Sequence, residues 1–390
     1  MSDAVIVATA RTPIGRARKG SLVDVDAFEL ARITIGAVIE RSGIATSDLD
    51  DLVVAESLQG GGVIARNIAV RLGLTSVPGL ADNRHCAAGL SAIQIAAASI
   101  RAGMDQAVVA GGTESLSTSP QSLKAAEPGG APVPWMSPSH PETPDAPTFD
   151  MSITVGENTA REMGLTRQDV DEWALYSTEN ALRSIDEGAF ESQIVPVPVT
   201  DRDGTSRTFT VDEHPRRGST LETLAALPVL HPEIEGATVT AANAAGLNDG
   251  AAAVVVTSSE FARSHGLKPL ARVVSWASVG IEPARTGLAP TLAIPKALDR
   301  IGMALDDVEL WEINEAFCSV PVAASRKLGI PQELMNVNGS GASLGHPIAC
   351  TGARMVVTMV NELHRRGKTI GCVSMCAGGG MGSAAVLEAV

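Results

Sequence analysis

Short, continuous apolar runs recur along the chain, and between them apolar residues return every three or four positions. The runs Val5 to Ala8, Ala107 to Ala110, Ala251 to Val256 and Ile370 to Val373 contain no charged residue. Such runs are typical of parallel strands buried on both faces. Their alternation with helical periodicity predicts an α/β fold made of βαβ units.

The segment from 87 to 102 shows the helical pattern clearly. Its apolar positions on one side are Leu90, Ile93, Ala97 and Ile100. Alanines fill the other faces, and Gly103 is a typical helix stop. An alanine-rich helix of this kind is expected to lie buried between two layers of the fold.

An internal repeat divides the chain. The octapeptide Leu49 to Glu56 recurs as Leu305 to Glu312, with Leu-Asp-Asp at its start and Glu at its end. Each copy follows a helical segment, which ends near Gly43 in one case and near Gly302 in the other. Further on, each copy is followed by a long helix and a buried strand. This order predicts two related halves.

The composition changes between the halves. Residues 119–150 hold eight prolines together with Gly129 and Gly130, which predicts a loop and no sheet element. Helical periodicity returns from 157 to 190, and Thr166 to Asp169 resembles a helix start. We therefore expect a first half of residues 1–118 plus 249–268, an inserted domain of 119–248, and a second half of 269–390.

The composition also restricts the function. The formal net charge is −14, which disfavours nucleic acid as a partner. No stretch approaches the roughly 20 apolar residues of a membrane span, and the first apolar run is too short for a signal peptide. The five cysteines (86, 318, 350, 372 and 376) lack disulfide-framework spacing, and no Cys/His spacing resembles a zinc site. We expect a soluble, cytoplasmic protein with no metal.

Two cysteines stand in settings that favour chemistry. Cys86 lies where a helix begins, so unpaired N–H groups and the helix dipole would lower its thiol pKa. Its alternative role is that of a small buried hydrophobic residue. Cys376 ends an apolar strand and precedes three glycines, whose amides could hold a thioester oxygen. The alternative is a glycine-rich turn beside a buried cysteine.

Two polar positions complete the candidate chemistry. His346 lies in a segment dense in glycine and serine, which can present an imidazole to a cavity as a base or an oxyanion donor. A solvated loop histidine is the alternative. Asn314 and Glu315 follow the second copy of the repeated strand, where α/β proteins place functional groups. For Glu315 a helix cap is an equally good interpretation.

Together these segments resemble the thiolase family over essentially the whole chain. Four motifs carry the resemblance: Asn83 to Leu90, Asn314 to Phe317, Gly345 to Pro347 and Cys376 to Gly382. The resemblance implies an α/β fold of two similar βαβ-rich halves in a five-layered α-β-α-β-α arrangement, with an inserted loop domain that carries much of the coenzyme A site. It also implies a homodimer or homotetramer that takes acyl-CoA substrates in fatty acid metabolism, with no tightly bound cofactor.

The resemblance also assigns the catalytic roles. Cys86 would accept the acyl group as a thioester, and His346 would take its proton. His346 and a water held by Asn314 would form one oxyanion hole, and the backbone N–H groups of Cys86 and Gly378 would form another. Cys376 would move the proton of the second substrate. The implied activity is that of an acyl-CoA C-acyltransferase, which either condenses two acyl-CoAs or cleaves a 3-oxoacyl-CoA with CoA.

Coenzyme A contacts follow from the same resemblance. Arg216 stands at the family's nucleotide-contacting arginine and Thr223 at a nearby hydroxyl position. Ala245 stands where many members have serine beside the pantetheine. The segment after Met151 has one residue more than usual, so either Met151 or Ser152 lines the acyl pocket.

Further departures and rival functions remain. Thr286 replaces a methionine of short-chain members, and the proline-rich loop differs from the usual tetramerisation loop. A ketoacyl synthase-like condensing enzyme generally lacks a counterpart of Cys376. A non-catalytic coenzyme A binding protein would not need Cys86, His346 and Cys376 together. A thiol redox protein is disfavoured because the chain has no Cys-x-x-Cys.

Overall fold

Mixed α/β architecture is evident in the computed structural model, which describes residues 2–201 and 203–390. The strands are β1 (Ala4–Arg11), β2 (Gly15–Arg16), β3 (Asp51–Ala55), β4 (Leu80–Asp82), β5 (Ala107–Ser115), β6 (Leu123–Ala125), β7 (Pro132–Pro134), β8 (Val197–Thr200), β9 (Ser206–Phe209), β10 (Asn248–Ser258), β11 (Ala271–Gly280), β12 (Leu310–Ile313), β13 (Ile370–Ala377) and β14 (Met381–Ala389). The α-helices are α1 (Ala27–Ser42), α2 (Ile64–Arg71), α3 (Ala88–Ala102), α4 (Asn158–Glu162), α5 (Arg167–Asp186), α6 (Leu221–Ala225), α7 (Ser259–Ser264), α8 (Pro290–Asp299), α9 (Ser319–Leu328), α10 (Gly341–Leu344) and α11 (Ile348–Arg366).

The large sheet contains the same strand arrangement twice. One half runs β4-β3-β5-β10-β1 and the other runs β12-β13-β14-β11. In each half the first long pair is parallel, β3 with β5 and β12 with β13, and the following pairs are antiparallel. A parallel bridge from Trp311 to Met335 takes the place that β4 has beside β3. The prediction of two similar halves is confirmed.

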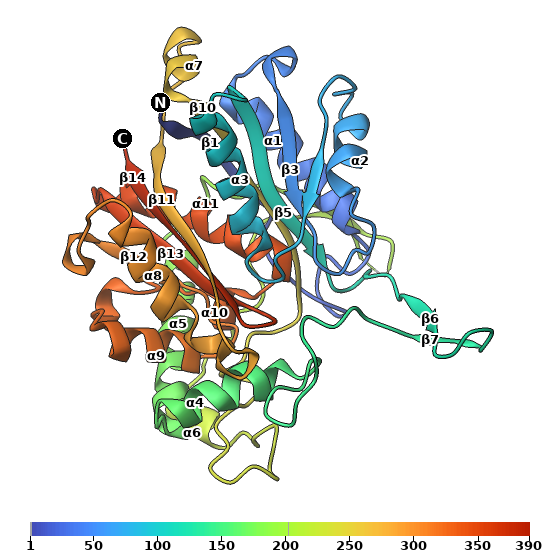
Figure 1. Ribbon diagram of the computed structural model, residues 1–390, viewed down its shortest axis with the longest axis vertical. Coiled ribbons are helices and arrows are strands. Elements are labelled where there is room, and N and C mark those ends of the chain that lie inside the picture. The colour runs from blue at the N-terminus through green and yellow to red at the C-terminus, as the bar shows by residue number, and fades with distance from the viewer. Residues whose placement is uncertain (1, 202) are drawn as a thin grey trace.

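Five layers follow from this duplication (Figure 1). Helices α3 and α11 pack against each other and against both halves of the sheet, in one continuous apolar core. Helices α1 and α2 cover the outer face of the first half, and α8 and α9 cover the outer face of the second. The alanine-rich helix is buried between layers, as its sequence predicts.

The strand directions differ from the prediction. β1 and β10 make antiparallel pairs on both sides, and β5 and β13 each have one parallel and one antiparallel neighbour. Helices cover both faces of the sheet, and this burial alone produces continuous apolar runs. The apolar runs therefore correctly predicted that the strands are buried. The further inference that buried strands pair in parallel was wrong.

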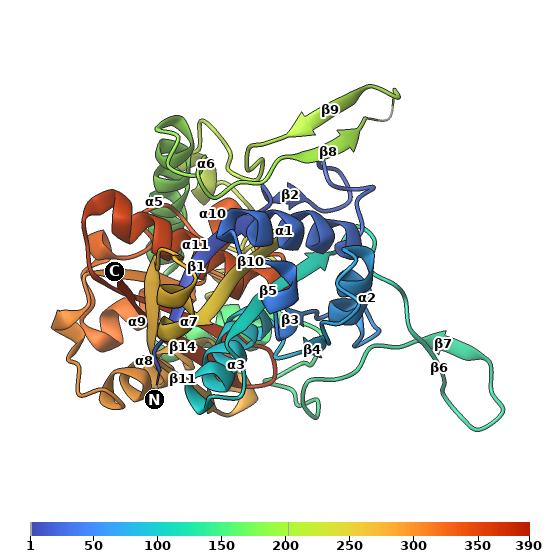
Figure 2. The same cartoon turned by 90° about the horizontal axis from the view of Figure 1, so that it is seen from above.

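The proline-rich segment is also more ordered than predicted. β6 and β7 form a short antiparallel hairpin whose pairs include Leu123 with Pro134 and Ala125 with Pro132. The hairpin projects from the body in two perpendicular views (Figure 2). Proline fits a two-stranded ribbon because its missing N–H can face away from the partner strand. The predicted start of α5 is confirmed by a capping box between Thr166 and Asp169.

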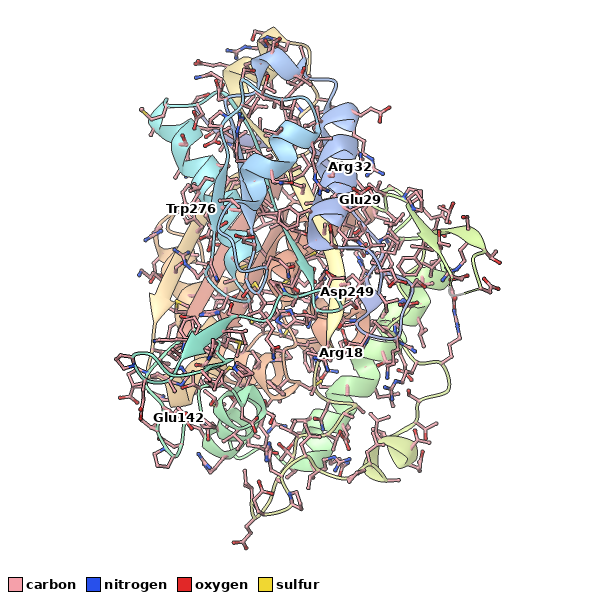
Figure 3. All side chains as sticks on the ribbon, turned by 90° about the vertical axis from the view of Figure 1, so that its right-hand side faces the viewer. Arg18, Glu29, Arg32, Glu142, Asp249 and Trp276 are labelled. Carbon is pink, nitrogen blue, oxygen red and sulfur yellow. The ribbon has the colours of Figure 1, made fainter. Side chains whose placement is uncertain are left out.

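The outer helix α1 attaches to the sheet through its apolar side. Ala31 and Ile35 are buried against the first half of the sheet. On the opposite side Glu29 and Arg32 lie next to each other (Figure 3) and form an ion pair of 2.6 Å. Both side chains are well exposed, and such pairs contribute only about 0.3–0.5 kcal/mol. Apolar packing therefore fixes this layer. No helix in residues 2–201 and 203–390 is long and apolar enough to cross a membrane.

Candidate active site

Two helices bring the candidate residues of the two halves together. A Cβ built on Gly89 of α3 would lie 2.4 Å from the carbonyl oxygen of Ala349 at the start of α11. A Cβ on Gly352 would lie 2.4 Å from the N atom of Leu90. Only glycine permits this approach of backbone to backbone. The N-terminal ends of α3 and α11 therefore meet, and Cys86 and His346 precede them.

Cys86 lies two residues before α3, in a tight turn. His85 has a left-handed backbone with φ of 46°, and its N–H donates to the side-chain oxygen of Asn83 over 2.8 Å. Cys86 packs against the central core and keeps partial exposure to solvent. The turn thus directs the Cys86 side chain toward the place where the two halves of the fold meet.

The pKa of Cys86 differs from the prediction. Burial raises the pKa of the thiol to about 11, although hydrogen bonds from the backbone N–H groups of Gly378 and Cys86 act to lower it. Glu114 adds a smaller upward effect. The helix start was expected to favour thiolate, but removal from water outweighs it. The resting sulfur is a protonated thiol, so its reaction requires a base.

Cys376 and the glycines after it are the part of the second half that lies next to Cys86. Cys376 is buried near the end of β13, and burial raises its pKa, with the neighbouring Cys86 as a second cause. The turn from β13 to β14 requires glycine at Gly380, where φ is 78° and a Cβ would lie 2.1 Å from the carbonyl oxygen of Ile281. The predicted glycine-rich turn is confirmed, and it approaches the Cys86 sulfur through Gly378.

Thr286 fixes this turn. Its hydroxyl accepts a hydrogen bond of 3.0 Å from the N–H of Gly380 and donates to the carbonyl of Pro283 over 2.7 Å. The side chain is fully buried. The departure noted in the sequence therefore ties the segment before α8 to the glycine turn.

Replacing Thr286 by valine should lower kcat by about tenfold to a hundredfold, because the turn that carries Gly378 loses its support. Valine keeps the volume and removes the hydroxyl. Thr291→Val is the matched control: this threonine is also buried, but its hydroxyl donates to the carbonyl of Leu288, just before α8. Steady-state kinetics and thermal unfolding of both variants test this. Equal kcat in the two variants would remove the role of Thr286.

His346 is buried and its ring orientation is fixed. The backbone N–H of His346 donates to the Asn248 side-chain oxygen over 3.0 Å, and the ring atom Nδ1 lies 2.6 Å from the Thr351 hydroxyl. The Asn314 amide nitrogen lies 3.5 Å from Nε2. Because an amide N–H can only donate, Nε2 carries the lone pair and Nδ1–H donates to Thr351. This tautomer can accept a proton at Nε2.

The environment also keeps His346 neutral. Burial lowers the pKa of the imidazole to about 3, and the positive charge of Arg354 acts in the same direction. A neutral imidazole is the form that a general base needs. The solvated loop histidine is therefore excluded as an interpretation.

Asn314 and Glu315 have different surroundings and different roles. The Asn314 amide faces His346, and its Oδ1 is buried with no partner in the described part of the chain. Glu315 is also buried, but its oxygens accept from the side chains of Trp173 and Ser177 on α5. It also accepts from Asn336 and from the N–H of Ala342. Glu315 thus joins the inserted domain to the second half.

Two of the residues proposed to contact coenzyme A, Arg216 and Thr223, border a separate cavity of about 180 Å³. Arg216, Ser219 and Thr223 line it together with Ser343. The hydroxyl of Thr223 bonds back to Thr220 in the capping box of α6. Arg216 is exposed and forms no ion pair within residues 2–201 and 203–390, whereas its neighbour Arg217 pairs with Asp186.

The remaining sequence candidates are Met151, Ser152 and Ala245. Met151 has its sulfur 3.8 Å from a Cβ built on Gly378. The Ser152 hydroxyl bonds instead to Asp150 over 2.5 Å and lies 2.6 Å from Nε2 of His231. Residues Ser152–Glu157 form a π-helix, the wider turn that accommodates an additional residue. Ala245 donates its N–H to Ala316 over 2.9 Å, and it offers only a methyl group.

Asn248 and Thr351 were missed from the sequence, and Thr286 was noted there only as a departure from short-chain members. Asn248, Thr351 and Thr286 each make one of the hydrogen bonds that hold the site. Thr351 follows His346 by five positions at the start of a helix, a spacing that could have suggested contact. Asn248 and Thr286 carry no local signal, since their partners are about a hundred positions away.

Covalent acyl transfer is the chemistry that suits a buried thiol that accepts backbone N–H hydrogen bonds beside a second thiol, with a neutral imidazole before the adjoining helix. A duplicated five-layered fold with this site defines the class of condensing enzymes. The chain belongs to the thiolase family. Residues 4–260 match the family's model "Thiolase, N-terminal domain" and residues 267–389 match "Thiolase, C-terminal domain".

Individual relatives cover the whole chain. Acetyl-CoA acetyltransferase of Escherichia coli is 40% identical over 100% of this chain and 99% of its own length. 3-Ketoacyl-CoA thiolase of Bacillus subtilis is 38% identical over 100% of both chains. The crystal structure of Bacillus anthracis acetyl-CoA acetyltransferase superposes with a TM-score of 0.92 at 38% identity, over 100% of this chain and 99% of that one.

Proposed function

We propose that this chain is an acyl-CoA C-acyltransferase of the thiolase type, which joins two acyl-CoAs or cleaves a 3-oxoacyl-CoA with CoA through an acyl-cysteine intermediate. The observation that carries the proposal is the convergence of the Gly378 N–H and Cys376 on the Cys86 sulfur. A buried thiol with a second thiol and a backbone donor beside it suits two-step acyl transfer.

In the cleavage direction, Cys86 sulfur attacks the 3-oxo carbon while Nε2 of His346 takes the thiol proton. The N–H groups of Cys86 and Gly378 stabilise the oxygen that becomes negative. The bond between C2 and C3 then breaks, and its electron pair remains on C2 of the departing acyl-CoA. His346 and Asn314 stabilise the resulting enolate, which receives a proton from Cys376.

In the second step the thiol of CoA loses its proton to Cys376 and attacks the acyl group on Cys86. The new acyl-CoA forms and the Cys86 sulfur leaves, recovering its proton from His346. Each cysteine ends the cycle as it began. The two rivals make different demands: a ketoacyl synthase-like enzyme needs no proton carrier at Cys376, and a CoA-binding protein needs no acylation at all.

The deciding experiment is mass spectrometry of the intact protein after brief exposure to acetyl-CoA or acetoacetyl-CoA. We expect an acetyl adduct on Cys86 that disappears when CoA is added. A protein that binds CoA without acquiring an adduct would be a binding protein. An adduct on another cysteine would assign the nucleophile differently.

Arg216 is proposed to contact a phosphate of coenzyme A. Arg216→Ala should weaken CoA binding by about fivefold to tenfold, as expected for one exposed charge-assisted contact. Arg217→Ala removes the same charge one position away, from a residue that already pairs with Asp186, and should change affinity less than twofold. Isothermal titration of CoA into both variants measures the difference. Equal effects would indicate only the general loss of positive charge.

We also propose a homodimer or homotetramer located in the cytoplasm. Support for assembly comes from β4, which within residues 2–201 and 203–390 pairs on one side only and exposes Leu80. An edge strand with an exposed apolar residue is a common pairing surface. Light scattering of the purified protein measures the oligomeric state.

A further inference from the structure

A second, larger cavity of about 830 Å³ lies beside the turn that carries Cys86. Its walls come from the motif around His85, from Met381 at the start of β14, and from both ends of the proline-rich segment, including Trp135 and Phe149. The base of the β6–β7 hairpin forms its outer part, while the tip projects away from the body (Figure 2). Pockets of about 300–1,000 Å³ suit ligands far larger than an acetyl group.

The cavity adjoins the turn that carries the reacting sulfur. His85 immediately precedes Cys86, and its Cγ lies 3.9 Å from a Cβ built on Gly378. Met381 and Cys86 both pack against the central core. The cavity therefore begins one residue from Cys86, at a side chain that lies close to Gly378.

The coenzyme A cavity is separate from the larger one. Its walls include Ser343 and Arg216, and it shares no lining residue with the larger cavity. Ser343 belongs to α10, which ends two residues before His346, whereas the larger cavity is lined by His85, the residue before Cys86, and by Met381. A substrate with its nucleotide at Arg216 would cross the catalytic residues before its acyl tail reached the larger cavity.

The lining sets the chemistry of the ligand. No Asp, Glu, Lys or Arg lines the cavity, and its large apolar side chains are Leu58, Trp135, Met136, Phe149 and Met381. His85 is its only titratable lining residue; burial lowers its pKa, and His140 acts in the same direction. Lys124 lies outside this lining, with its Nζ 5.3 Å from the centroid of the Trp135 ring. A carboxylate on a tail would lose its hydration among apolar rings without a cation in the lining itself, and an apolar tail would cover exposed rings.

We propose that this cavity holds the tail of a long or bulky, uncharged acyl group attached to Cys86. The inference rests on the proposed acyltransferase function and adds its substrate class. Trp135 and Phe149, which are 41% and 57% exposed, become covered when the tail binds. The same lining disfavours a dicarboxylic 3-oxoacyl-CoA.

The test compares thiolysis of acetoacetyl-CoA, 3-oxohexadecanoyl-CoA and a dicarboxylic 3-oxoacyl-CoA by the full-length enzyme. Ser137→Trp fills the cavity, and Ala126→Trp places the same side chain on the same loop outside the lining. Phe149→Ala removes apolar wall without filling the space. We expect kcat/KM for the long substrate to fall about tenfold in Ser137→Trp and Phe149→Ala. Acetoacetyl-CoA should change less than twofold in all three variants, and the dicarboxylic substrate should be cleaved at least tenfold more slowly than the long one.

The failures are distinguishable. If acetoacetyl-CoA is cleaved and the long substrate is not, or if Ser137→Trp leaves the long substrate unaffected, the tail does not occupy this cavity and the acyltransferase function stands. If Ser137→Trp splits the oligomer in size-exclusion chromatography without selective loss of the long substrate, the cavity is a contact between copies and the inference is overturned. If no substrate is cleaved and Cys86 is never acylated, the proposed function itself fails.

Discussion

Replacing Cys376 by alanine should reduce turnover by about a thousandfold or more while Cys86 still accepts an acyl group from acetyl-CoA. In the proposed mechanism acylation uses Cys86, His346 and backbone donors, so it does not require the second sulfur. Condensation and thiolysis both move a proton at carbon or at the CoA thiol, and the mechanism assigns this transfer to Cys376. Losing a general acid–base costs about 10²–10⁴ in rate.

The measurement has two parts, an adduct mass after one exposure to acetyl-CoA and steady-state thiolysis of acetoacetyl-CoA. Cys372→Ala is the matched control, because Cys372 is fully buried on the same strand and lies in the core behind the site. It should keep turnover within about threefold at a modest loss of stability. Loss of acylation in Cys376→Ala would give Cys376 a role in the first step. Full turnover would remove it from the mechanism.

The sequence predicted the architecture because the duplication leaves marks that survive in local patterns. The octapeptide repeat, the helix stops at Gly43 and Gly302, and the paired helix and strand that follow are all short-range signals. Strand direction is not such a signal. Because β1 and β10 are buried on both faces, they show the same continuous apolar runs as parallel strands. The strand direction inferred from these runs was therefore wrong there.

The candidate site divides in the same way. The motifs around Cys86, His346 and Cys376 are local, and the structure brings these segments together. The charge states depend on everything packed around them. A helix start near Cys86 predicts that the thiol pKa is lowered. Burial in the surrounding core raises this pKa instead. The support of Gly380 by Thr286 is likewise invisible in sequence, because the two are joined only by folding.

Replacing His346 by alanine should slow acylation of Cys86 by about a thousandfold, because the sulfur rests as a thiol with a pKa near 11 and needs a base. Thr351→Val should slow it by about tenfold. Valine preserves the shape but leaves Nδ1–H without its acceptor, so the tautomer with a proton on Nε2 gains population. Stopped-flow acylation by acetyl-CoA measures both. An unaffected rate in His346→Ala would show that the thiol is deprotonated by another route.

The pH dependence of acylation tests the same mechanism without a mutation. His346 acts as a base only when neutral, and burial lowers its pKa to about 3. Cys86 keeps its proton until the pH approaches about 11. The acylation kcat/KM should therefore stay level from about pH 5.5 to about pH 9, since neither group changes state in that window. A histidine with an ordinary pKa would instead halve the rate near about pH 6.5. A fall with that midpoint in the wild type would mean that His346 has an ordinary pKa and that burial does not keep it neutral.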